Sequence, residues 1–510
     1  MSTRSDYALA SASGVLLALS FPKFGHSALG WIALTPLLVA LCAKSRPQPA
    51  GLGAPFVLGL LTGVIYFTGT LYWITRVMAV YGGLTGWVAV LINALLIAYL
   101  ALYPAVFAVV VRRIVVVHGP AALMAAPLVW VTAELGRTYI AGFPWVLLGY
   151  SQTSMLPIAQ LASIFGVYGL SMLVAAVSAA LAIVAIERRI TPAIAAVTIV
   201  IVIAVWGGRR AARSEWTRDG DPIRVGLIQG NVDQGQKWDP ARATAIFQDY
   251  LRMTRQAIGQ GAQFILWPES STPFYFEEDR PDAELVRATA RGSGVAMLFG
   301  SDQIEWKIEG NKRVADKYFN SAFVVRPDGT TAGFYRKMHL VPFGEYVPYK
   351  DLLAFAAPLV ENSGPFSPGV DPTVLPVNNH PVSVAICYEV VYPALMRQFV
   401  VRGSELLTTI TNDAWFGTSS APYQHFEQAS MRAIEEGRYL VRAANTGISG
   451  IVDPYGHVLA ASRIFEPAVV VGDARFLHDS TFYARHGDIV AYASAVMTLV
   501  LVVFSRRRVE

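Results

Sequence analysis

Four residues in the second half of the chain have side chains suited to acyl transfer through a thiol. Cys387 ends the apolar run 382–386 and is a candidate nucleophile. Glu269 follows a buried-strand pattern, Lys337 closes another strand, and Glu345 follows a Pro-Phe-Gly turn. A carboxylate can take the thiol proton and return it to a leaving group, and a fixed positive charge can stabilise an oxyanion. Composition and spacing do not show that these residues meet in space.

The local pattern places Cys387 at a strand-to-helix turn. The alternating run 382–386 predicts a buried strand, and residues 393–402 predict a helix. A sulfur at such a turn faces backbone N–H groups and a helix N-terminus, which favour thiolate over thiol. The alternative is that Cys387 is a small hydrophobic core residue and that the charged residues are solvated surface groups.

The composition is too apolar for an ordinary soluble protein. Of the 510 residues, 54% are hydrophobic and only 15% are charged, and the mean hydropathy is +0.43. The excess lies in segments long enough to span a bilayer, although the first alone would also suit a signal peptide. These eight segments are 7–23, 27–43, 55–76, 84–111, 120–136, 161–186, 191–208 and 489–505.

Basic residues orient these segments. With the N-terminus in the cytoplasm, basic clusters fall on the cytoplasmic side, as the positive-inside rule requires, and the large polar region lies outside. The clusters are near 44–46, 112–113, 188–189 and 506–508. Six other basic residues fall on the opposite side, so the bias is incomplete: Lys23, Arg76, Arg137, Arg209, Arg210 and Arg213. No basic, aromatic-interleaved surface indicates nucleic acid.

These patterns predict three parts. Residues 1–210 form a transmembrane bundle of seven helices, 220–480 an exterior catalytic domain, and 489–510 a last transmembrane helix with a cytoplasmic tail. In the exterior domain strand-like and helix-like stretches alternate, which indicates a layered α/β fold. Expected strands cover 223–229, 264–267, 295–300, 322–325, 331–336, 382–386 and 405–410, and expected helices cover 240–258, 282–291, 393–402 and 424–438.

Two further features bear on this division. Of the two cysteines, Cys42 lies in an apolar segment and Cys387 in the exterior domain, so a disulfide between them is implausible. A lone thiol in an oxidising compartment is a liability unless it is buried or used, which favours a reactive role. The apolar connection 137–154 is broken by Gly and Pro, and either dips into the exterior interface with Trp145 and Tyr150 at headgroup depth or is a plain interfacial loop.

Three segments resemble the signature segments of the nitrilase superfamily. They are Trp267-Pro268-Glu269, the run 335–345 containing Lys337 and Glu345, and Ile386-Cys387-Tyr388-Glu389. Seven apolar segments before this domain and one after it make the whole chain similar to the apolipoprotein N-acyltransferase family of the bacterial inner membrane. The resemblance implies an αββα sandwich on the periplasmic side of a bundle of eight transmembrane helices.

The resemblance also implies roles for the matching residues. Glu269 would be the general base, Lys337 would stabilise the oxyanion, Cys387 would be the nucleophile and Glu345 a supporting carboxylate. Other positions that match the family around the site are Tyr388, Glu389, Trp238, Asn412, Trp415 and Phe416. The last three could equally form a turn anchored by buried aromatic rings.

The implied reaction is ping-pong. Cys387 would take an acyl chain from the sn-1 position of a phospholipid, typically phosphatidylethanolamine, and pass it to the α-amino group of a diacylglyceryl-cysteine on an apolipoprotein. No metal or organic cofactor is implied, and we expect a monomer. Both lipid substrates stay in the bilayer, and each buried methylene is worth about 0.8 kcal/mol. An active site tethered above the membrane meets both without extracting their chains.

Two apolar exterior segments, 274–276 and 352–360, support a lipid substrate. We expect them to form mobile arms at the membrane face, with Phe274, Phe276, Phe355 and Leu359 at the substrate entrance. The alternative is core packing.

Two rival classes remain open. A membrane-anchored amidase of the nitrilase type would hydrolyse a small amide and need no lipid entry. A non-enzymatic membrane scaffold would have no reason to retain Glu269, Lys337 and Cys387 together.

Overall fold

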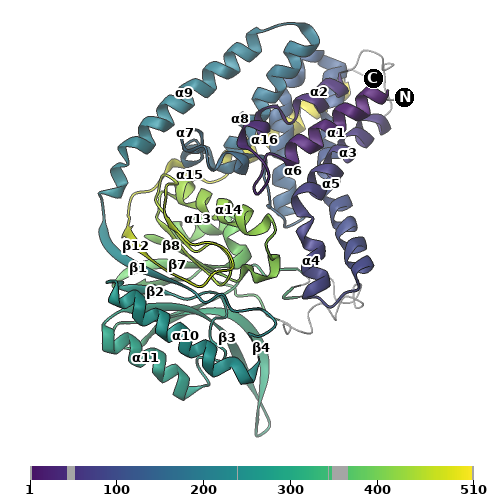
Figure 1. Cartoon of the computed structure of the whole chain (residues 1–510). Helices are drawn as coiled ribbons and strands as arrows, with labels where there is room; N and C mark the ends of the chain where they lie inside the picture. Colours follow the sequence, from purple (N-terminus) through teal and green to yellow (C-terminus); the bar gives the residue numbers. More distant parts are fainter. Residues whose placement is uncertain (1–2, 43–51, 238, 343, 347–365, 508–510) are drawn as a thin grey trace. The chain divides into compact units, whose positions relative to one another are not determined.

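The structure, a computed structural model, describes residues 3–42, 52–237, 239–342, 344–346 and 366–507 (Figure 1). Contacts divide the chain into two compact units. The first combines Met1–Thr75, Gly86–Arg213 and Thr481–Glu510, and the second combines Arg76–Thr85 with Ser214–Ser480. The short segment Arg76–Thr85 therefore groups with the second unit, which the sequence did not indicate.

The first unit is helical. Helix α4 (Trp73–Val80) begins in it and runs into the second unit. Its other helices are α1 (Arg4–Ala18), α2 (Thr35–Leu41), α3 (Gly53–Leu71), α5 (Gly86–His118), α6 (Ala126–Tyr139), α7 (Leu156–Ala159), α8 (Ala162–Glu187), α9 (Thr191–Arg213), α15 (Phe482–His486) and α16 (Ile489–Arg507).

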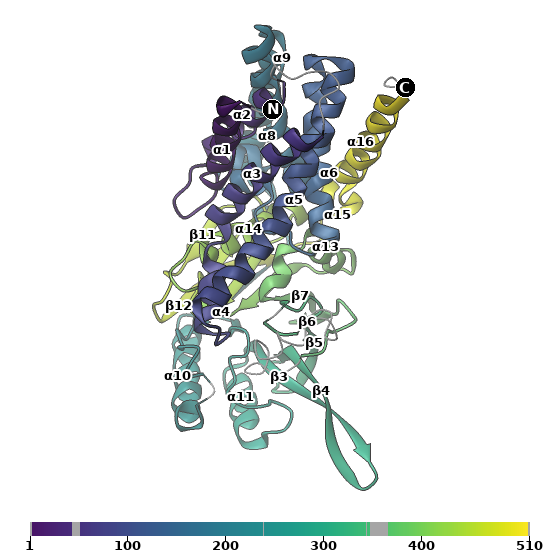
Figure 2. The ribbon, with the colours of Figure 1, turned by 90° about the vertical axis from the view of Figure 1, so that its right-hand side faces the viewer.

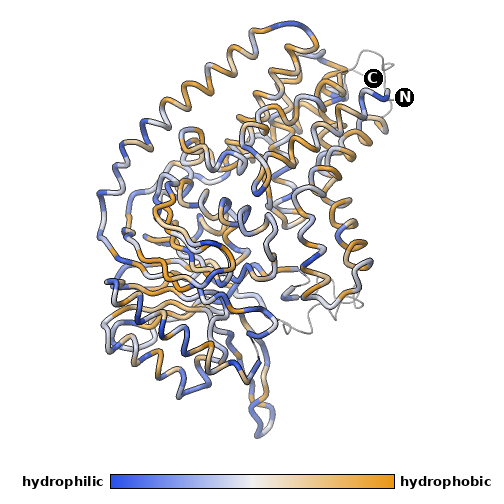
Figure 3. Tube along the Cα trace, in the orientation of Figure 1, coloured by the Kyte–Doolittle hydropathy of each residue, from blue (hydrophilic) through white to orange (hydrophobic). Residues whose placement is uncertain are grey.

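Within the described residues, four helices are long and apolar enough to cross a membrane: Gly53–Leu71, Gly86–His118, Ala162–Glu187 and Thr191–Thr217. The sequence predicted eight. Of the remaining segments, two form shorter apolar helices, while α1 and α6 have 15 and 14 residues, about 22 Å at 1.5 Å per residue. Hydrophobic residues recur along α9 (Figure 3), and many of its large apolar side chains are exposed, as on a surface that contacts lipid. The first unit is membrane-embedded.

The connection after α6 is folded into the first unit. Trp145 and Tyr150 are 1% exposed, so they are buried in protein rather than at an interface. Arg137 Nη1 donates to Trp145 O at 2.6 Å, and Glu134 Oε1 accepts from Leu148 N at 2.6 Å. Buried backbone groups need such partners because water cannot reach them.

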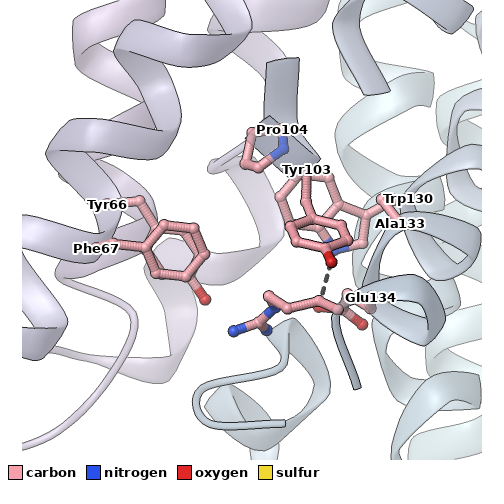
Figure 4. A pocket seen from close by; sticks show the side chains of 8 residues that line it. Tyr66, Phe67, Tyr103, Pro104, Trp130, Ala133 and Glu134 are labelled. Carbon is pink, nitrogen blue, oxygen red and sulfur yellow. Dashed lines mark hydrogen bonds between the residues drawn. The ribbon is translucent and has the colours of Figure 1, made fainter. Parts of the chain in front are cut away.

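A small cavity lies beside this connection, between α3, α5 and α6 (Figure 4). Trp130 Nε1 donates to Glu134 Oε1 at 3.0 Å, and the Tyr66 hydroxyl donates to the Val146 carbonyl. The polar groups around the cavity thus hold the connection in place. The lining residues are Tyr66, Phe67, Tyr103, Pro104, Trp130, Ala133, Glu134 and Arg137.

The second unit contains two six-stranded sheets. In the first sheet the order is β12-β1-β2-β3-β4-β5, and in the second it is β11-β10-β9-β8-β7-β6. The central pairs β1–β2–β3 and β7–β8–β9 are parallel. The strands are β1 (Asp221–Gln229), β2 (Phe264–Leu266), β3 (Ala296–Glu309), β4 (Lys312–Val325), β5 (Thr331–Arg336), β6 (Val374–Val377), β7 (His380–Ile386), β8 (Leu406–Thr411), β9 (Leu440–Ala444), β10 (Gly450–Val452), β11 (Val458–Ala461) and β12 (Ala468–Phe476).

Helices cover the outer faces of the two sheets. Helices α10 (Pro240–Gly259) and α11 (Arg280–Ser293) pack on the first sheet through a cluster of buried apolar side chains (Figure 2). Helices α13 (Pro393–Val401) and α14 (Ala421–Glu436) contact the second sheet, and the inner faces of the sheets contact each other. The layers are therefore helix, sheet, sheet, helix, which agrees with the sandwich that the resemblance implied.

The hairpin of β3 and β4 is much longer than the sequence indicated. The two strands are 14 residues long each, and their far end leaves the sheet as a two-stranded ribbon (Figure 2). That end carries charged cross-strand pairs such as Lys317–Glu305 and Lys307–Asp316 instead of an apolar face. A search for alternating apolar residues therefore found only the buried ends of these strands.

Phe276 belongs to the core of the second unit, so its prediction as a residue of a mobile arm was wrong. It is 2% exposed, and its ring centroid lies 4.8 Å from that of Phe299 and 5.3 Å from that of Phe323. Phe274 packs against the same cluster and is partly buried. Within the apolar run 274–276, Phe276 is therefore a core residue.

We expect Phe276→Ala to destabilise the second unit by about 3–5 kcal/mol, because it removes a fully packed aromatic side chain. Ile308→Ala is the matched control, since Ile308 is 81% exposed on β3. Thermal unfolding in detergent should show a lowered midpoint for the first variant only. Equal midpoints for the two variants would contradict the core assignment.

Candidate active site

Cys387 lies at a sharp turn at the end of β7. Its φ angle is 54°, in the left-handed region, and a 3-10 helix, η6 (Cys387–Val391), begins at it. This conformation costs a non-glycine residue about 1–2 kcal/mol. The turn is held by Glu389, whose Oε2 accepts from Ile386 N at 2.8 Å. The predicted strand-to-helix position of Cys387 is confirmed, with a 3-10 turn between the strand and α13.

Glu389 also ties this turn to the end of β5. Its Oε1 accepts from the Tyr335 hydroxyl at 2.8 Å, from Met338 N at 2.6 Å and from His339 N at 3.1 Å. These donors flank Lys337. One fully buried carboxylate thus links the backbone beside the thiol to the backbone beside the ammonium.

Glu269 follows β2 and reaches toward the same place. Its Oε1 accepts from Asn320 Nδ2 at 2.7 Å and from Lys337 Nζ at 3.2 Å, and its Oε2 accepts from Asn412 N at 2.9 Å. Asn320 lies on β4 and Asn412 directly follows β8, so both sheets hold this carboxylate. The sequence prediction had no role for Asn320.

Lys337 directly follows β5 and is 1% exposed. Its Nζ lies 2.9 Å from Glu345 Oε1 and 3.2 Å from Glu269 Oε1. Glu345 Oε2 accepts from Val341 N at 2.7 Å, and its Oε1 accepts from Asn320 Nδ2 at 2.9 Å. The ammonium is therefore shared between two carboxylates whose positions are fixed by further hydrogen bonds.

The charges of these groups set the state of the thiol. Burial and the neighbouring charge of Glu269 raise the pKa of Cys387 well above its usual range, although Lys337 acts against them. The sequence indicated that the turn favours the thiolate, but burial, which favours the neutral thiol, is the largest influence on this pKa. Burial alone would raise the pKa of Glu269, but Lys337 and Lys237 outweigh it and hold that pKa below its usual value.

Lys337 itself stays charged. Burial lowers its pKa, yet Glu269 and Glu345 outweigh burial and raise the pKa well above the usual range. The site at rest therefore contains a neutral thiol, an ionised carboxylate and an ammonium group. This set can move a proton from sulfur to Glu269 as the thiol attacks a carbonyl carbon, with a cation at hand for the charge that develops.

A second cation, Lys237, was missed in the sequence. It is 7% exposed, and its Nζ donates to the Glu269 carbonyl oxygen at 3.1 Å. Burial lowers its pKa, while the charges of Glu269, Asp302 and Cys387 act in the opposite direction. The one signal in the sequence that pointed to Lys237 was its place next to Trp238, which was predicted as a site residue. Asp302, which accepts from Ser270 Oγ at 2.8 Å, has a pKa raised to about 6 by burial.

The remaining predicted residues fall into two groups. Trp238, Phe355 and Leu359 lie outside the described residues. Tyr388 is buried and packs edge-on against Tyr392, with ring centroids 5.3 Å apart. Asn412 Nδ2 donates to Gln234 Oε1 at 2.5 Å, and its Oδ1 accepts from Asn445 Nδ2 at 3.0 Å.

The aromatic residues after Asn412 contact two different neighbours. Trp415 packs edge-on against Tyr81, with ring centroids 5.1 Å apart, and the Tyr81 hydroxyl donates to the Ala414 carbonyl at 3.1 Å. Phe416 lies edge-on to the ring of His425. Among the residues that the structure describes, no group of three His, Cys, Asp or Glu side chains could hold a metal ion.

Two protein families match parts of this chain. The carbon-nitrogen hydrolase family matches residues 224–475, so the second unit is a carbon-nitrogen hydrolase domain. The apolipoprotein N-acyltransferase N-terminal domain matches residues 13–180. An amidase from Nesterenkonia sp. of known structure is 23% identical, covers 51% of this chain and 93% of its own, and has a TM-score of 0.38.

Full-length relatives are more similar. The apolipoprotein N-acyltransferase of Geobacter metallireducens is 42% identical over 99% of this chain and 96% of its own length. That of Methylococcus capsulatus is 34% identical over 98% of this chain and 96% of its own length. The chain belongs to the apolipoprotein N-acyltransferase family, and the small-amide hydrolase alternative is not favoured.

The position of Glu269 depends on Gly300 of β3. A Cβ atom at Gly300 would lie 2.4 Å from Ser270 N and 2.7 Å from Glu269 Cα, so the backbone of Glu269 would have to move. We expect Gly300→Ala to slow acylation of Cys387 by about 10²-fold, the usual effect of a 1 Å misplacement. Gly292→Ala, at a glycine with open space around it, should be unaffected. Equal acylation rates in the two folded variants would contradict this dependence.

The protonation states predict an unusual pH profile for alkylation of Cys387 by iodoacetamide. Since the pKa of Glu269 is held below 4.5 and that of the thiol is raised above 9.0, neither group changes charge between about pH 5 and 9. The rate should be level across this window, whereas an ordinary thiol speeds up about tenfold per pH unit below its pKa.

The Glu269→Gln variant supplies the comparison. Without the carboxylate, alkylation should be slower and should regain the tenfold slope per pH unit. Mass spectrometry of labelled Cys387→Ser accounts for labelling of Cys42. A wild-type rate that rises tenfold per pH unit would contradict proton transfer to Glu269.

Proposed function

We propose that this protein transfers an acyl chain from the sn-1 position of a phospholipid to the α-amino group of the N-terminal diacylglyceryl-cysteine of an apolipoprotein. One observation carries the proposal: a single chain joins a membrane-embedded helical unit to a unit in which Lys337 Nζ contacts Glu269 Oε1 at 3.2 Å and Glu389 ties the backbone beside Lys337 to the turn of Cys387. The names of the full-length relatives support the reaction and its acceptor.

In the first half-reaction, the Cys387 sulfur attacks the carbonyl carbon of the sn-1 ester while Glu269 takes the thiol proton. The carbonyl oxygen becomes an oxyanion in the tetrahedral intermediate, and the Lys337 charge and the Tyr388 N–H stabilise it. The C–O bond to glycerol then breaks, and Glu269 returns the proton to the leaving oxygen. The products are a lysophospholipid and a thioester on Cys387.

In the second half-reaction, the neutral α-amino group of the acceptor attacks the thioester carbonyl. Glu269 takes one proton from the attacking nitrogen, and the C–S bond breaks. The proton passes to the departing sulfur, which restores the thiol and leaves an amide on the acceptor. No metal or organic cofactor enters either step.

The burial of the site suits both half-reactions. An ionised Glu269 beside Lys337 is a base throughout neutral pH, and the neutral thiol avoids placing a third anion next to Glu269 and Glu345. The thioester must be kept from water until the amine arrives. We propose that Phe355 and Leu359, with Phe274, line the lipid entrance, as their apolar character indicates.

The cellular setting is part of the proposal. Eight transmembrane helices, with 1–210 and 489–510 in the bundle and 220–480 as the catalytic domain, place the basic clusters on the cytoplasmic side. The catalytic domain then faces the periplasm from a bacterial inner membrane. We expect the enzyme to act as a monomer, because both substrates can reach one site by lateral diffusion.

Intact mass spectrometry tests this function. After incubation of the detergent-purified protein with phosphatidylethanolamine, we expect a mass increase of one acyl chain that hydroxylamine removes. Cys387→Ser should show no increase. A diacylglyceryl peptide with a free N-terminus should discharge the adduct, and the same peptide with an acetylated N-terminus should not, because its nitrogen cannot attack.

Other outcomes would support other classes. An adduct that only water discharges would indicate a hydrolase. A protein that forms no adduct with any phospholipid, although Cys387 is alkylated by iodoacetamide, would contradict the proposed transfer.

A further inference from the structure

A cluster of buried polar side chains lies behind the turn at Cys387. It consists of His425 on α14, Asp413 at the start of the 3-10 helix η7 (Asp413–Phe416) and Arg442 on β9, all 0% exposed. His425 Nε2 lies 3.2 Å from the Cys387 carbonyl oxygen. This histidine therefore contacts the backbone of the nucleophile and not its sulfur.

The cluster fixes which nitrogen of His425 carries a proton. A carbonyl oxygen can only accept, so Nε2 must carry the N–H that it donates to Cys387. On the other side of the ring, Arg442 Nη2 lies 3.0 Å from Nδ1 and 2.9 Å from Asp413 Oδ2. Burial and the Arg442 charge lower the pKa of His425, while Asp413 and the hydrogen bond to the Cys387 carbonyl act in the opposite direction.

Asp413 is itself held in place. Its Oδ1 accepts from the Thr411 hydroxyl at 2.9 Å and lies 3.0 Å from His425 Nδ1. Burial alone would raise its pKa, but Arg442 and His425 outweigh burial and lower it to about 2. The carboxylate is thus ionised whenever the enzyme is folded near neutral pH, and it anchors Arg442 against the ring.

Holding one carbonyl oxygen determines the direction of the next N–H. The peptide group between Cys387 and Tyr388 is planar, and in a trans peptide the C=O and the N–H point in opposite directions. His425 holds the C=O from the second-sheet side of the turn. The Tyr388 N–H is then directed away from His425, and rotation of this peptide plane is opposed by a charge-supported hydrogen bond.

We propose that His425 is a positioning residue for the oxyanion site: by holding the Cys387 carbonyl, it aims the Tyr388 N–H at the oxygen of the tetrahedral intermediate. This inference rests on the proposed acyl transfer through Cys387. It assigns no contact between His425 and the substrate. Glu389 holds the preceding N–H of Ile386, so the two residues fix the turn on both sides of the nucleophile.

Two reactions of the same sulfur separate this role from general structural support. Formation of the acyl-enzyme passes through an oxyanion, whereas alkylation by iodoacetamide displaces iodide and forms none. A misdirected Tyr388 N–H should therefore slow acylation and spare alkylation. Loss of packing around the turn would slow both.

The test compares His425→Asn with His425→Gln. The Gln amide nitrogen can occupy the position of Nε2 and donate to the Cys387 carbonyl, whereas the shorter Asn side chain can reach only the position of Nδ1. Both variants lose the imidazole ring, and they differ from each other by one methylene group. His478→Gln, at an exposed histidine with a 67% exposed side chain, is the surface control.

We expect His425→Asn to lower the rate of acyl-enzyme formation from phosphatidylethanolamine by about 10²-fold, the usual loss for one oxyanion donor. His425→Gln should recover most of this rate. Alkylation of Cys387 should stay within about threefold of wild type in both, since the thiol and Glu269 are untouched.

Three results would overturn the inference. Acylation and alkylation that fall together in both variants would indicate structural support only. An acylation rate in His425→Asn equal to that of wild type would show that the carbonyl contact does not aim the N–H. A wild-type protein that is alkylated but forms no acyl-enzyme would contradict the proposed function as well, which distinguishes the two failures.

Discussion

The candidate site depends on one buried ammonium group shared by two carboxylates. Lys337 is almost completely buried, and removing an ammonium from water costs several kcal/mol. Its contacts of 2.9 Å with Glu345 and 3.2 Å with Glu269 offset that cost. The same charge holds Glu269 in its ionised form beside a thiol that burial keeps neutral. The same contacts of Lys337 therefore balance the buried charges and keep Glu269 available as a base.

The two sheets share the task of building this arrangement. Glu269 and Lys337 follow strands of the first sheet, and Cys387 and Asn412 follow strands of the second. Side chains bridge the sheets: Glu389 joins the Cys387 turn to the end of β5, and the Asn412 backbone donates to Glu269. Because each bridge spans strands from both layers, the geometry of the site is a property of the sandwich and not of any one loop.

The sequence predicted those features of the fold and the site that depend on neighbouring residues in the chain. Apolar runs located most buried strands of the second unit, and the turns after them located Glu269 and Cys387, since strand ends are marked by adjacent residues. Asn320, Lys237 and His425 were not found, because their partners lie on strands or helices far away in sequence. The effect of burial on the pKa of the thiol was not predicted for a related reason: the turn is local, whereas burial by surrounding layers is not. Composition predicted eight transmembrane segments, but only four of the described helices are long and apolar enough to cross a membrane.

The most direct test is a double-mutant cycle on thermal unfolding with Lys337→Met and Glu345→Gln. Lys337→Met leaves two buried carboxylates without their cation, and breaking a buried pair in this way costs about 3–5 kcal/mol. If charge balance is the controlling constraint, adding Glu345→Gln to Lys337→Met should raise the unfolding midpoint, because it removes one of the two unpaired charges. A double variant whose midpoint falls by the sum of the two single losses would contradict the account.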